Sequence, residues 1–268
     1  MATGLNNAAG AGSVIRTGRV EIDAHDGVAV IRLNRPEKMN AFDAEQIAAF
    51  ESALRWFVET PKIRVGVLTG SGRAFCAGGD ITSFDAIDVE RGYPYTRRGY
   101  DILRSLEVSE KPMIAAVDGW CLAGGLEVAL ACDFIIAGND ARFGFGELDL
   151  GLIPAWGGTV RLTRAVPSRM ARQMILTSER ISADRAHSLG MVNEVVDSGS
   201  ALARALELAA SIAAQPELAV RIAATVARVV ADGGDIEAAL AAERIGGALL
   251  FGTQDAHHAV RTWSARGD

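Results

Sequence analysis

The sequence predicts an α/β protein whose C-terminal region is helical. Up to about residue 160, short apolar runs typical of strands alternate with longer segments of helical periodicity. Beyond that point alanine becomes dense and helical patterns dominate. Alternating strands and helices are typical of an α/β core, and no linker-like run separates the helical end from it. A chain of 268 residues, 49% of them hydrophobic, can bury a large core.

The N-terminal elements follow from local signals. Residues 1–13 are rich in Ala, Gly and Asn and have nothing to bury, so we expect a disordered leader. Apolar runs at 20–23 and 28–33 flank Asp26-Gly27, a dipeptide typical of hairpin turns. Asp43 is expected to cap a helix over Ala44–Glu59, which ends before Pro61.

The remaining elements are predicted from the spacing of apolar residues along the sequence and from residues typical of turns. The polar stretch 87–98, which contains Pro94, is expected to be mobile. Further strands are expected at 64–69, 113–117, 134–137 and 192–196. Further helices are expected at 102–106, 126–131, 161–165, 168–176, 183–189, 201–214, 217–230 and 236–250.

Composition excludes several classes of protein. The net charge of −6 gives no global attraction to nucleic acid or to an anionic membrane. Three cysteines without a C-x-x-C motif, and four scattered histidines, disfavour zinc ribbons and disulfide scaffolds, so a reducing cytoplasm is the expected compartment. The N-terminus lacks the pattern of a signal peptide, and no stretch of 18 residues is free of charge, so no membrane span is expected.

The first candidate for ligand binding is the glycine-rich loop after the strand at 64–69. Gly70 and Gly72 resemble the start of a dinucleotide fingerprint, but Phe75 stands where the third glycine belongs, which disfavours a nucleotide site. In the stretch AFCAGGD, residues 74–80, paired glycines can turn backbone N–H groups toward a ligand. The alternative is an ordinary turn into a helix capped by Asp80.

The second candidate is the stretch DGWCLAGGLEVALACD, residues 118–133. A buried strand ends just before it, and a helix is expected to start near Gly124. Free N–H groups and the positive end of the helix dipole can stabilise a developing negative oxygen there. Glu127 follows three residues later, on the same helix face. A glutamate in a first turn is equally typical of a helix cap.

The third candidate is Glu147, in a glycine-rich and otherwise apolar stretch at 142–162. Between Phe145, Leu148 and Trp156, a carboxyl group would be partly desolvated, which raises its pKa toward the range of a proton donor. The alternative is a solvated loop carboxylate, and Asp149 competes as the second acid of the loop.

Together, these segments resemble the crotonase family, the enoyl-CoA hydratase/isomerase superfamily. The resemblance covers about residues 15–265, and its ordered motifs are highly specific. The matching stretches are NRPEKMNAF (34–42), AFCAGGD (74–80), DGWCLAGGLEVALACD (118–133), FGFGELDLGLIPAWGGTVRL (143–162) and ISADRAHSLGMVNEVV (181–196).

The resemblance implies a fold, an assembly and a substrate. The fold would be a spiral of ββα units with the active site in residues 14–197 and an α-helical region at 198–268 that serves oligomerisation and covers the CoA site. The assembly would be a homotrimer or a dimer of trimers. The substrate would be an acyl-CoA thioester, with no separate cofactor because CoA is part of the substrate, and with no metal.

The resemblance also implies the roles of particular residues. The two oxyanion-hole N–H groups fall on Gly79 and Gly124, Glu127 would activate the water, and Glu147 would supply the proton to the α-carbon. Phe251 matches an aromatic residue near the CoA end, often supplied by a neighbouring subunit. Two loops match the CoA-contacting segments, with the residues Arg35, Lys38, Ala74, Ala77, Gly79, Asp80 and Ile81.

The sequence departs from the family pattern at three places. Ala123 replaces the first of three glycines before Glu127. Phe145-Gly146 replaces the usual Gln-Pro, which predicts an aromatic side chain near the acyl pocket. The C-terminal tail lacks the customary lysines, so Arg261 is the candidate contact for the CoA 3′-phosphate. Phe84, the 87–100 stretch and Phe145 are expected to set the pocket volume, and Trp120 and Trp156 are expected in the core.

An enoyl-CoA hydratase is the leading prediction, and the enzymatic alternatives are other reactions that the same fold can catalyse. A double-bond isomerase is disfavoured by Glu127, and a dienoyl isomerase by Ala155, where an aspartate belongs. A thioester hydrolase or a decarboxylase remains open. A non-catalytic acyl-CoA-binding or RNA-binding homologue is disfavoured by the two glutamates and, for RNA, by the net charge of −6.

Overall fold

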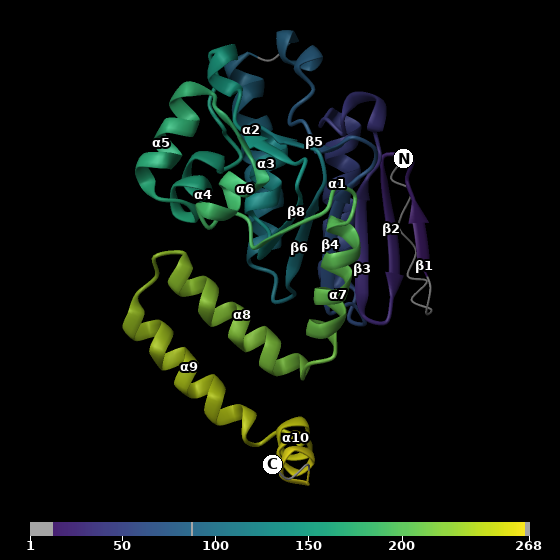
Figure 1. Cartoon of the computed structure of the whole chain (residues 1–268), viewed down its shortest axis with the longest axis vertical. Helices are drawn as coiled ribbons and strands as arrows, with labels where there is room; N and C mark the ends of the chain where they lie inside the picture. Colours follow the sequence, from purple (N-terminus) through teal and green to yellow (C-terminus); the bar gives the residue numbers. More distant parts are fainter. Residues whose placement is uncertain (1–12, 87, 266–268) are drawn as a thin grey trace.

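Two β-sheets form the centre of the molecule, with helices on their faces (Figure 1). This computed structural model describes residues 13–86 and 88–265. The predicted leader lies outside the described residues, apart from Ser13, where the first strand begins. The mixed α/β architecture is the predicted one.

The larger sheet has seven strands in the order β1-β2-β3-β4-β6-β8-β11. Its first three strands are antiparallel, and the predicted hairpin turn lies at Asp26-Gly27, where both residues have positive φ. From β3 to β11 all neighbours are parallel. The bounds are β1 Ser13–Arg16, β2 Val20–His25, β3 Val28–Leu33, β4 Val65–Gly70, β6 Met113–Val117, β8 Phe134–Gly138 and β11 Glu194–Val196.

The smaller sheet has four strands in the order β10-β9-β7-β5, and sequence patterns did not predict it. Each strand is three residues long, too short to show a period of two. The strands β5, β7 and β9 are parallel and lead into the three candidate loops. The bounds are β5 Ala74–Cys76, β7 Trp120–Leu122, β9 Arg142–Gly144 and β10 Arg180–Ser182.

The helices confirm most of the predicted pattern. Asp43 caps the first helix by accepting a hydrogen bond from the Gln46 N–H at 2.8 Å. The expectation of a mobile segment at 87–98 is wrong, because most of it belongs to α2, a 19-residue helix that contains Pro94. The bounds are α1 Ala44–Glu59, α2 Val89–Glu107, α3 Gly124–Leu130, α4 Gly158–Ala165, α5 Ser168–Thr177, α6 Ala183–Ser188, α7 Ala201–Ala213, α8 Glu217–Ala231, α9 Ile236–Leu250 and α10 Gln254–Ala265. Three 3₁₀ turns are η1 Pro36–Lys38, η2 Ile81–Ala86 and η3 Glu147–Leu150.

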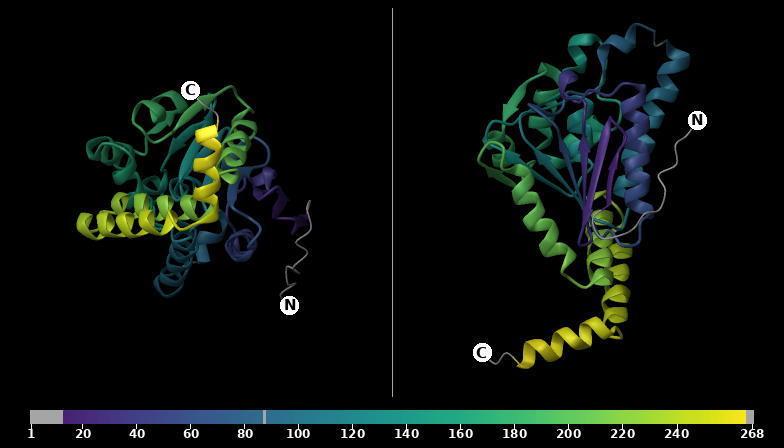
Figure 2. Two further views of the ribbon diagram at one scale, coloured as in Figure 1. Left: turned by 90° about the horizontal axis from the view of Figure 1, so that it is seen from below. Right: turned by 90° about the vertical axis from the view of Figure 1, so that its right-hand side faces the viewer.

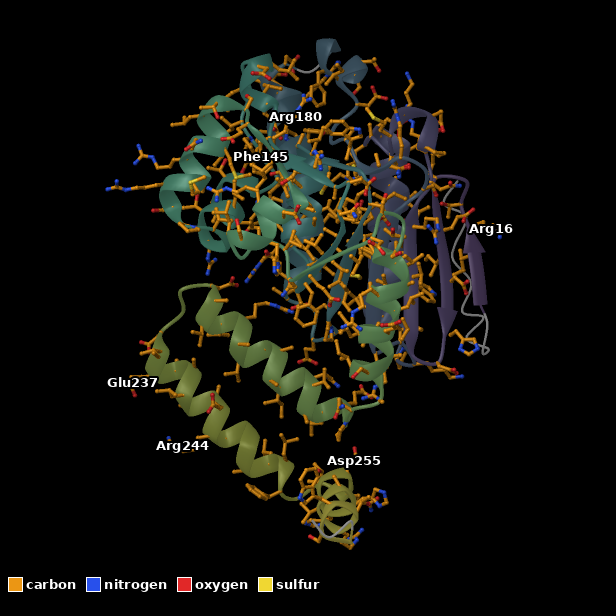
Figure 3. The ribbon with its side chains drawn as sticks, in the orientation of Figure 1. Arg16, Phe145, Arg180, Glu237, Arg244 and Asp255 are labelled. Atoms are coloured by element: carbon orange, nitrogen blue, oxygen red, sulfur yellow. The ribbon has the colours of Figure 1, made fainter. Side chains whose placement is uncertain are left out.

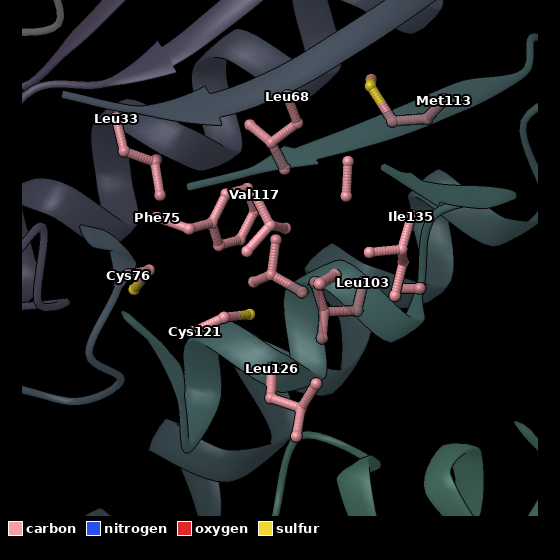
Figure 4. Packing of buried hydrophobic residues seen from close by; sticks show 14 of the residues in the cluster. Leu33, Leu68, Phe75, Cys76, Leu103, Met113, Val117, Cys121, Leu126 and Ile135 are labelled. Atoms are coloured by element: carbon pink, nitrogen blue, oxygen red, sulfur yellow. The ribbon is translucent and has the colours of Figure 1, made fainter. Parts of the chain in front are cut away.

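The main core lies between the two sheets and helices α1, α2 and α3. Figure 4 shows Leu68 of the larger sheet, Phe75 and Cys121 of the smaller sheet, and Leu126 of α3 converging on one cluster. The parallel strand β6 is fully buried, because its alternate side chains enter this core and a second cluster under α7. The loops that connect these strands and helices therefore begin and end at elements fixed by the core.

Helices α8 and α9 form a pair that extends from the body, and α10 leaves this pair at an angle (Figure 2). Arginines attach α8 to the body: Arg228 donates to the Ser109 carbonyl at 2.7 Å and to the Asp133 carboxylate at 2.8 Å. Nevertheless α8 has no buried residue. Helix α7 packs against the larger sheet, so the arm of α8, α9 and α10 begins at Glu217.

Candidate active site

The four residues that the sequence predicts to be catalytic lie on one cavity of about 380 Å³. They are Gly79 after β5, Gly124 and Glu127 in α3, and Glu147 after β9. The strands that precede them are neighbours in the smaller sheet and run in the same direction. Segments that lie far apart in the sequence therefore meet at the carboxyl ends of these strands.

Gly79 is held by a single parallel bridge to Phe42. The Phe42 N–H donates to the Gly78 carbonyl at 2.7 Å, and the Asp80 N–H donates to the Phe42 carbonyl at 2.9 Å. In such a bridge the N–H of the middle residue points away from the partner strand. The Gly79 N–H consequently faces the side opposite Phe42, and it donates no hydrogen bond to a described residue.

Gly124 is the first residue of α3, where the helix leaves its N–H groups without internal partners. The two loops approach closely: a β-carbon on Gly78 would lie 3.0 Å from the Gly124 nitrogen and 2.5 Å from Ala123 Cβ. Ala123 itself has φ +50°, a conformation that favours glycine, so the turn before α3 carries backbone strain. The N–H groups of Gly79 and Gly124 can thus converge on one oxygen atom.

Glu127 is buried, with an exposed fraction of 3%. Its Oε1 accepts hydrogen bonds from the Trp156 N–H at 2.8 Å and the Gly158 N–H at 2.7 Å, so it does not cap its own helix. Burial raises the pKa of Glu127 to about 7; these two N–H groups oppose the shift, and the charge of Glu147 adds to it. A carboxyl group near neutrality can accept or release a proton at physiological pH.

Glu147 begins η3 and is half-buried. Its Oε2 is buried and has no hydrogen-bond partner among the described residues. Burial also raises the pKa of Glu147, with backbone N–H groups acting against that shift. Asp149, the competing acid, is exposed and does not line the cavity. The structure thus favours Glu147 as the acid that faces the cavity.

Aromatic rings form one wall of the cavity. Trp156 lies 5.3 Å from Phe42 and 5.6 Å from Tyr95, measured between ring centroids. Tyr95 lies 5.9 Å from Phe84, which confirms Phe84 as a pocket residue. Trp156 is both a core residue, as predicted, and part of this wall.

Phe145 does not lie where the sequence suggested. It is fully buried and absent from the cavity lining, and a β-carbon placed on Gly158 would lie 2.7 Å from both its ring and the Glu127 side chain. Phe145 directly follows β9 and continues the alternation of that strand, so Phe143 and Phe145 both lie in the core, while Gly146 lines the cavity.

The loops that match CoA-contacting segments are linked to each other. Arg35 binds the Asp80 carboxylate at 2.8 Å and the Asp43 carboxylate at 3.2 Å. Hydrogen bonds from Thr82, and then from Arg35, lower the pKa of Asp80 to about 2. Buried Asn40 donates to carbonyls in and beside β5, including that of Ala74 at 2.8 Å. Arg35 and Asp80 are thus built into the support of the Gly79 loop.

The other predicted CoA-contacting residues are dispersed. Ala77 and Ile81 line the cavity, whereas the Ala74 side chain is buried in β5 and Lys38 is exposed in η1. Phe251 follows α9, is 79% exposed, and does not line the cavity. Figure 1 shows the end of α9 at the opposite end of the molecule from β5.

Motifs did not single out every cavity residue. Tyr95 lies in the 87–100 stretch that was expected to set the pocket volume but was not named as a site residue, and Arg180 was not predicted. Arg180 opens β10, opposite Gly144, and its guanidinium lies 5.8 Å from the centroid of the Trp120 ring. Figure 3 shows Arg180 and Phe145 in the body of the molecule, far from Glu237 and Arg244 on the arm.

The described residues offer neither a metal site nor a membrane span. Within residues 13–86 and 88–265, no three His, Cys, Asp or Glu side chains gather into a group that could hold a metal ion. No helix in this part of the chain is long and apolar enough to cross a membrane.

Comparisons with known proteins show the family to which the chain belongs. Residues 23–250 match the family model described as enoyl-CoA hydratase/isomerase. Crotonyl-CoA hydratase of Syntrophomonas wolfei is 36% identical, over 87% of this chain and 90% of its own length. Short-chain-enoyl-CoA hydratase of Clostridium acetobutylicum is 35% identical, over 90% of this chain and 92% of its own length.

Solved structures give the same result for the fold. The enoyl-CoA hydratase of Bacillus anthracis superimposes with a TM-score of 0.88 at 30% identity, covering 92% of this chain and 96% of that one. The enoyl-CoA hydratase subunit I of Geobacillus kaustophilus gives a TM-score of 0.87 at 34% identity, covering 93% of this chain and 96% of that one.

Proposed function

Because the chain belongs to the enoyl-CoA hydratase/isomerase family, we propose that it adds water across the double bond of a 2-enoyl-CoA. The observation that carries this proposal is the meeting of two carboxyl groups and two free N–H groups on one cavity. A hydratase needs all four, because it must stabilise one oxygen and move protons at two places.

The N–H groups of Gly79 and Gly124 would bind the thioester oxygen. When water adds to the β-carbon, the electron pair of the double bond moves toward the thioester and the oxygen becomes an enolate. Two preformed backbone donors stabilise that charge without reorganising, and each is worth about 3 kcal/mol in comparable sites.

Glu127 and Glu147 would divide the proton transfers. Glu127 accepts a proton from water as the water oxygen bonds to the β-carbon, and Glu147 gives a proton to the α-carbon as the enolate collapses. The environments fit this division, because Glu127 keeps two N–H donors that favour its anion, whereas the buried Oε2 of Glu147 has no partner among the described residues.

The rest of the substrate would lie along the loops at 35–38 and 74–81. Backbone and side chains of Ala77 and Ile81 face the cavity, and the Arg35–Asp80 pair holds the loop in place. Lys38, and Phe251 from a neighbouring copy, would contact the CoA end. No cofactor or metal takes part in this proposal, since CoA belongs to the substrate.

The proposed assembly is a homotrimer or a dimer of trimers. The arm of α8, α9 and α10 supports it, because large apolar side chains on these helices are exposed although the helices are regular. The proposed compartment is the cytoplasm, which suits the three free cysteines Cys76, Cys121 and Cys132.

Replacement of Glu127 by Gln tests the function. The amide oxygen of Gln can still accept from the Trp156 and Gly158 N–H groups, so the fold should be kept while the base is lost. We expect the hydration rate of crotonyl-CoA to fall by about 10²-fold or more. A 3-to-2 double-bond shift, which needs only one base, should be less affected.

The assay follows loss of the conjugated thioester absorbance, and mass spectrometry identifies a gain of one water. Asp149→Asn is the matched control, because it neutralises an exposed carboxylate beside Glu147 and should leave the rate unchanged. Normal hydration by Glu127→Gln, or a wild type that only moves double bonds, would show that the proposal is wrong.

A further inference from the structure

Tyr95 is a half-buried polar residue of the cavity that has no role in the proposed reaction so far. It lies in α2, directly after Pro94, and its ring is held between Phe84 and Trp156. It lines the same cavity as Gly79, Gly124 and Glu127. The ring position is therefore fixed by packing on both sides.

The Tyr95 hydroxyl lies next to Gly79. A β-carbon placed on Gly79 would be 3.1 Å from this hydroxyl and 2.5 Å from Phe84 Cζ, so the absence of a side chain at position 79 leaves room for both rings. Within the described residues the hydroxyl makes no hydrogen bond. A half-buried O–H group that lines a cavity and has no partner among the described residues is available to a bound molecule.

The distance suits a shared acceptor. A β-carbon lies about 2.5 Å from the nitrogen of its own residue, so the hydroxyl is at most about 5.6 Å from the Gly79 nitrogen. One oxygen that accepts from both groups at about 2.9 Å can span that separation. The thioester oxygen assigned to the Gly79 N–H would be such an acceptor.

The protonation state also suits a donor. Burial raises the pKa of Tyr95, and the nearby charge of Glu127 raises it further. The phenol therefore stays neutral and keeps its proton across the working pH range, which excludes a role as a base.

We propose that the Tyr95 hydroxyl donates a third hydrogen bond to the thioester oxygen, beside the N–H groups of Gly79 and Gly124. This inference rests on the proposed function, since it assigns that oxygen to these two N–H groups. It makes Tyr95 a catalytic residue, because the bond would strengthen as the oxygen becomes an enolate.

The first test is Tyr95→Phe, which keeps the ring packing and removes only the hydroxyl. We expect kcat for crotonyl-CoA to fall about 10-fold with little change in KM, since the bond matters most in the transition state. Tyr93→Phe is the matched control, because Tyr93 lies on the same helix and is 70% exposed. Its kcat should equal that of the wild type.

The second test does not depend on turnover. Acetoacetyl-CoA forms an enolate with its own near-ultraviolet absorbance, and donors at the thioester oxygen increase the enolate fraction of the bound ligand. Tyr95→Phe should lower this fraction about 10-fold, while the affinity for saturated butyryl-CoA stays within twofold of the wild type.

The outcomes separate the two proposals. A wild type that binds acetoacetyl-CoA as enolate but hydrates nothing would overturn the hydratase assignment and leave the role of Tyr95 standing. An unchanged enolate fraction in Tyr95→Phe would overturn the role of Tyr95, whether or not kcat falls.

Discussion

Two opposing effects of its surroundings set the pKa of Glu127. Its burial disfavours the anion, whereas the N–H groups of Trp156 and Gly158 favour it. The outcome, a pKa of about 7, places the carboxyl group where a small change in pH alters its charge. A cap on an exposed helix end would have no such sensitivity.

We predict a bell-shaped dependence of kcat/KM on pH: it rises as the proposed base Glu127, with a pKa of about 7, loses its proton, and it falls at higher pH, where Glu147 loses the proton that it must give. The stability of the fold should fall over the rising part of this profile. A carboxyl group whose pKa is raised by folding stabilises the fold fully below its unfolded pKa, about 4.3, and this contribution is lost as pH rises through 7. The loss is up to about 4 kcal/mol.

Two measurements check these predictions: a pH–rate profile for kcat/KM and thermal unfolding for the stability of the fold. Both cover pH 5 to pH 8, an interval of about three units around the shifted pKa. In Glu127→Gln the stability loss over this interval should be smaller than in the wild type. Equal pH dependence of unfolding in the two proteins would contradict the assignment of this pKa.

At the scale of elements, α2 approaches the cavity closely through Gly99. A β-carbon at this position would lie 2.2 Å from the indole ring of Trp156. Trp156 in turn supplies an N–H group to Glu127 and packs against Tyr95. A shift of α2 would therefore move Trp156, and with it the N–H group that binds the Glu127 carboxylate.

Gly99→Ala should destabilise the protein by about 1–3 kcal/mol, because the buried contact cannot accept another methyl group. It should also lower kcat, since displacement of Trp156 moves a hydrogen-bond donor of Glu127. Thermal unfolding and steady-state kinetics measure both effects.

The matched control is Gly247→Ala in α9, where a β-carbon meets nothing within 4 Å. Helix propensity should make that variant slightly more stable. A Gly99→Ala protein as stable and active as the wild type would show that α2 adjusts freely.

The same helix shows where sequence reasoning reaches its limit. Helix α1 was predicted to its exact bounds, because Asp43 caps it and its apolar residues repeat at helical spacing. Helix α2 was missed over its first turns because Pro94 and exposed Arg and Tyr residues suggest a loop, whereas contacts with the body hold it as a helix.

For the candidate site too, the sequence predicted what local motifs carry and missed what depends on the packing of distant segments. The glycine pairs and the two glutamates were found because short motifs carry them, and the structure places Gly79, Gly124, Glu127 and Glu147 on one cavity. Tyr95 was expected only as part of the 87–100 stretch, and Arg180 was missed, because only the packing of distant segments brings these two side chains to the cavity. Phe145 was misplaced because it lies just after β9, and the side on which this three-residue strand delivers it could not be predicted from the sequence.

At the scale of the whole molecule, the arm presents an unpartnered apolar surface. Ile245, Leu249, Phe251 and Trp263 are each at least 60% exposed. Single exposed apolar residues are ordinary, but such a concentration on one projecting unit marks an interaction surface.

Sedimentation or light scattering should give a mass of about three or six times 28.2 kDa. Replacing both Ile245 and Leu249 by Glu should shift the population toward the monomer, because the charges cannot be buried without partners. Val89→Glu, at a 90% exposed position on α2, is the control and should leave the mass unchanged. A wild-type monomer at micromolar concentration would contradict the proposed assembly.

The proposed oxyanion donors are main-chain groups, and this has a consequence for how the chain can evolve. A survey that deletes side chains one at a time would pass over them, because Gly79 and Gly124 have no side chain to delete. The vulnerable positions are those where an atom cannot be added: a β-carbon on Gly125 would lie 2.2 Å from the Cys76 carbonyl, and one on Gly78 would strike Ala123. Selection on the site would therefore be visible in which residues are tolerated at Gly125 and Gly78, although neither of them carries a chemical group that takes part in the reaction.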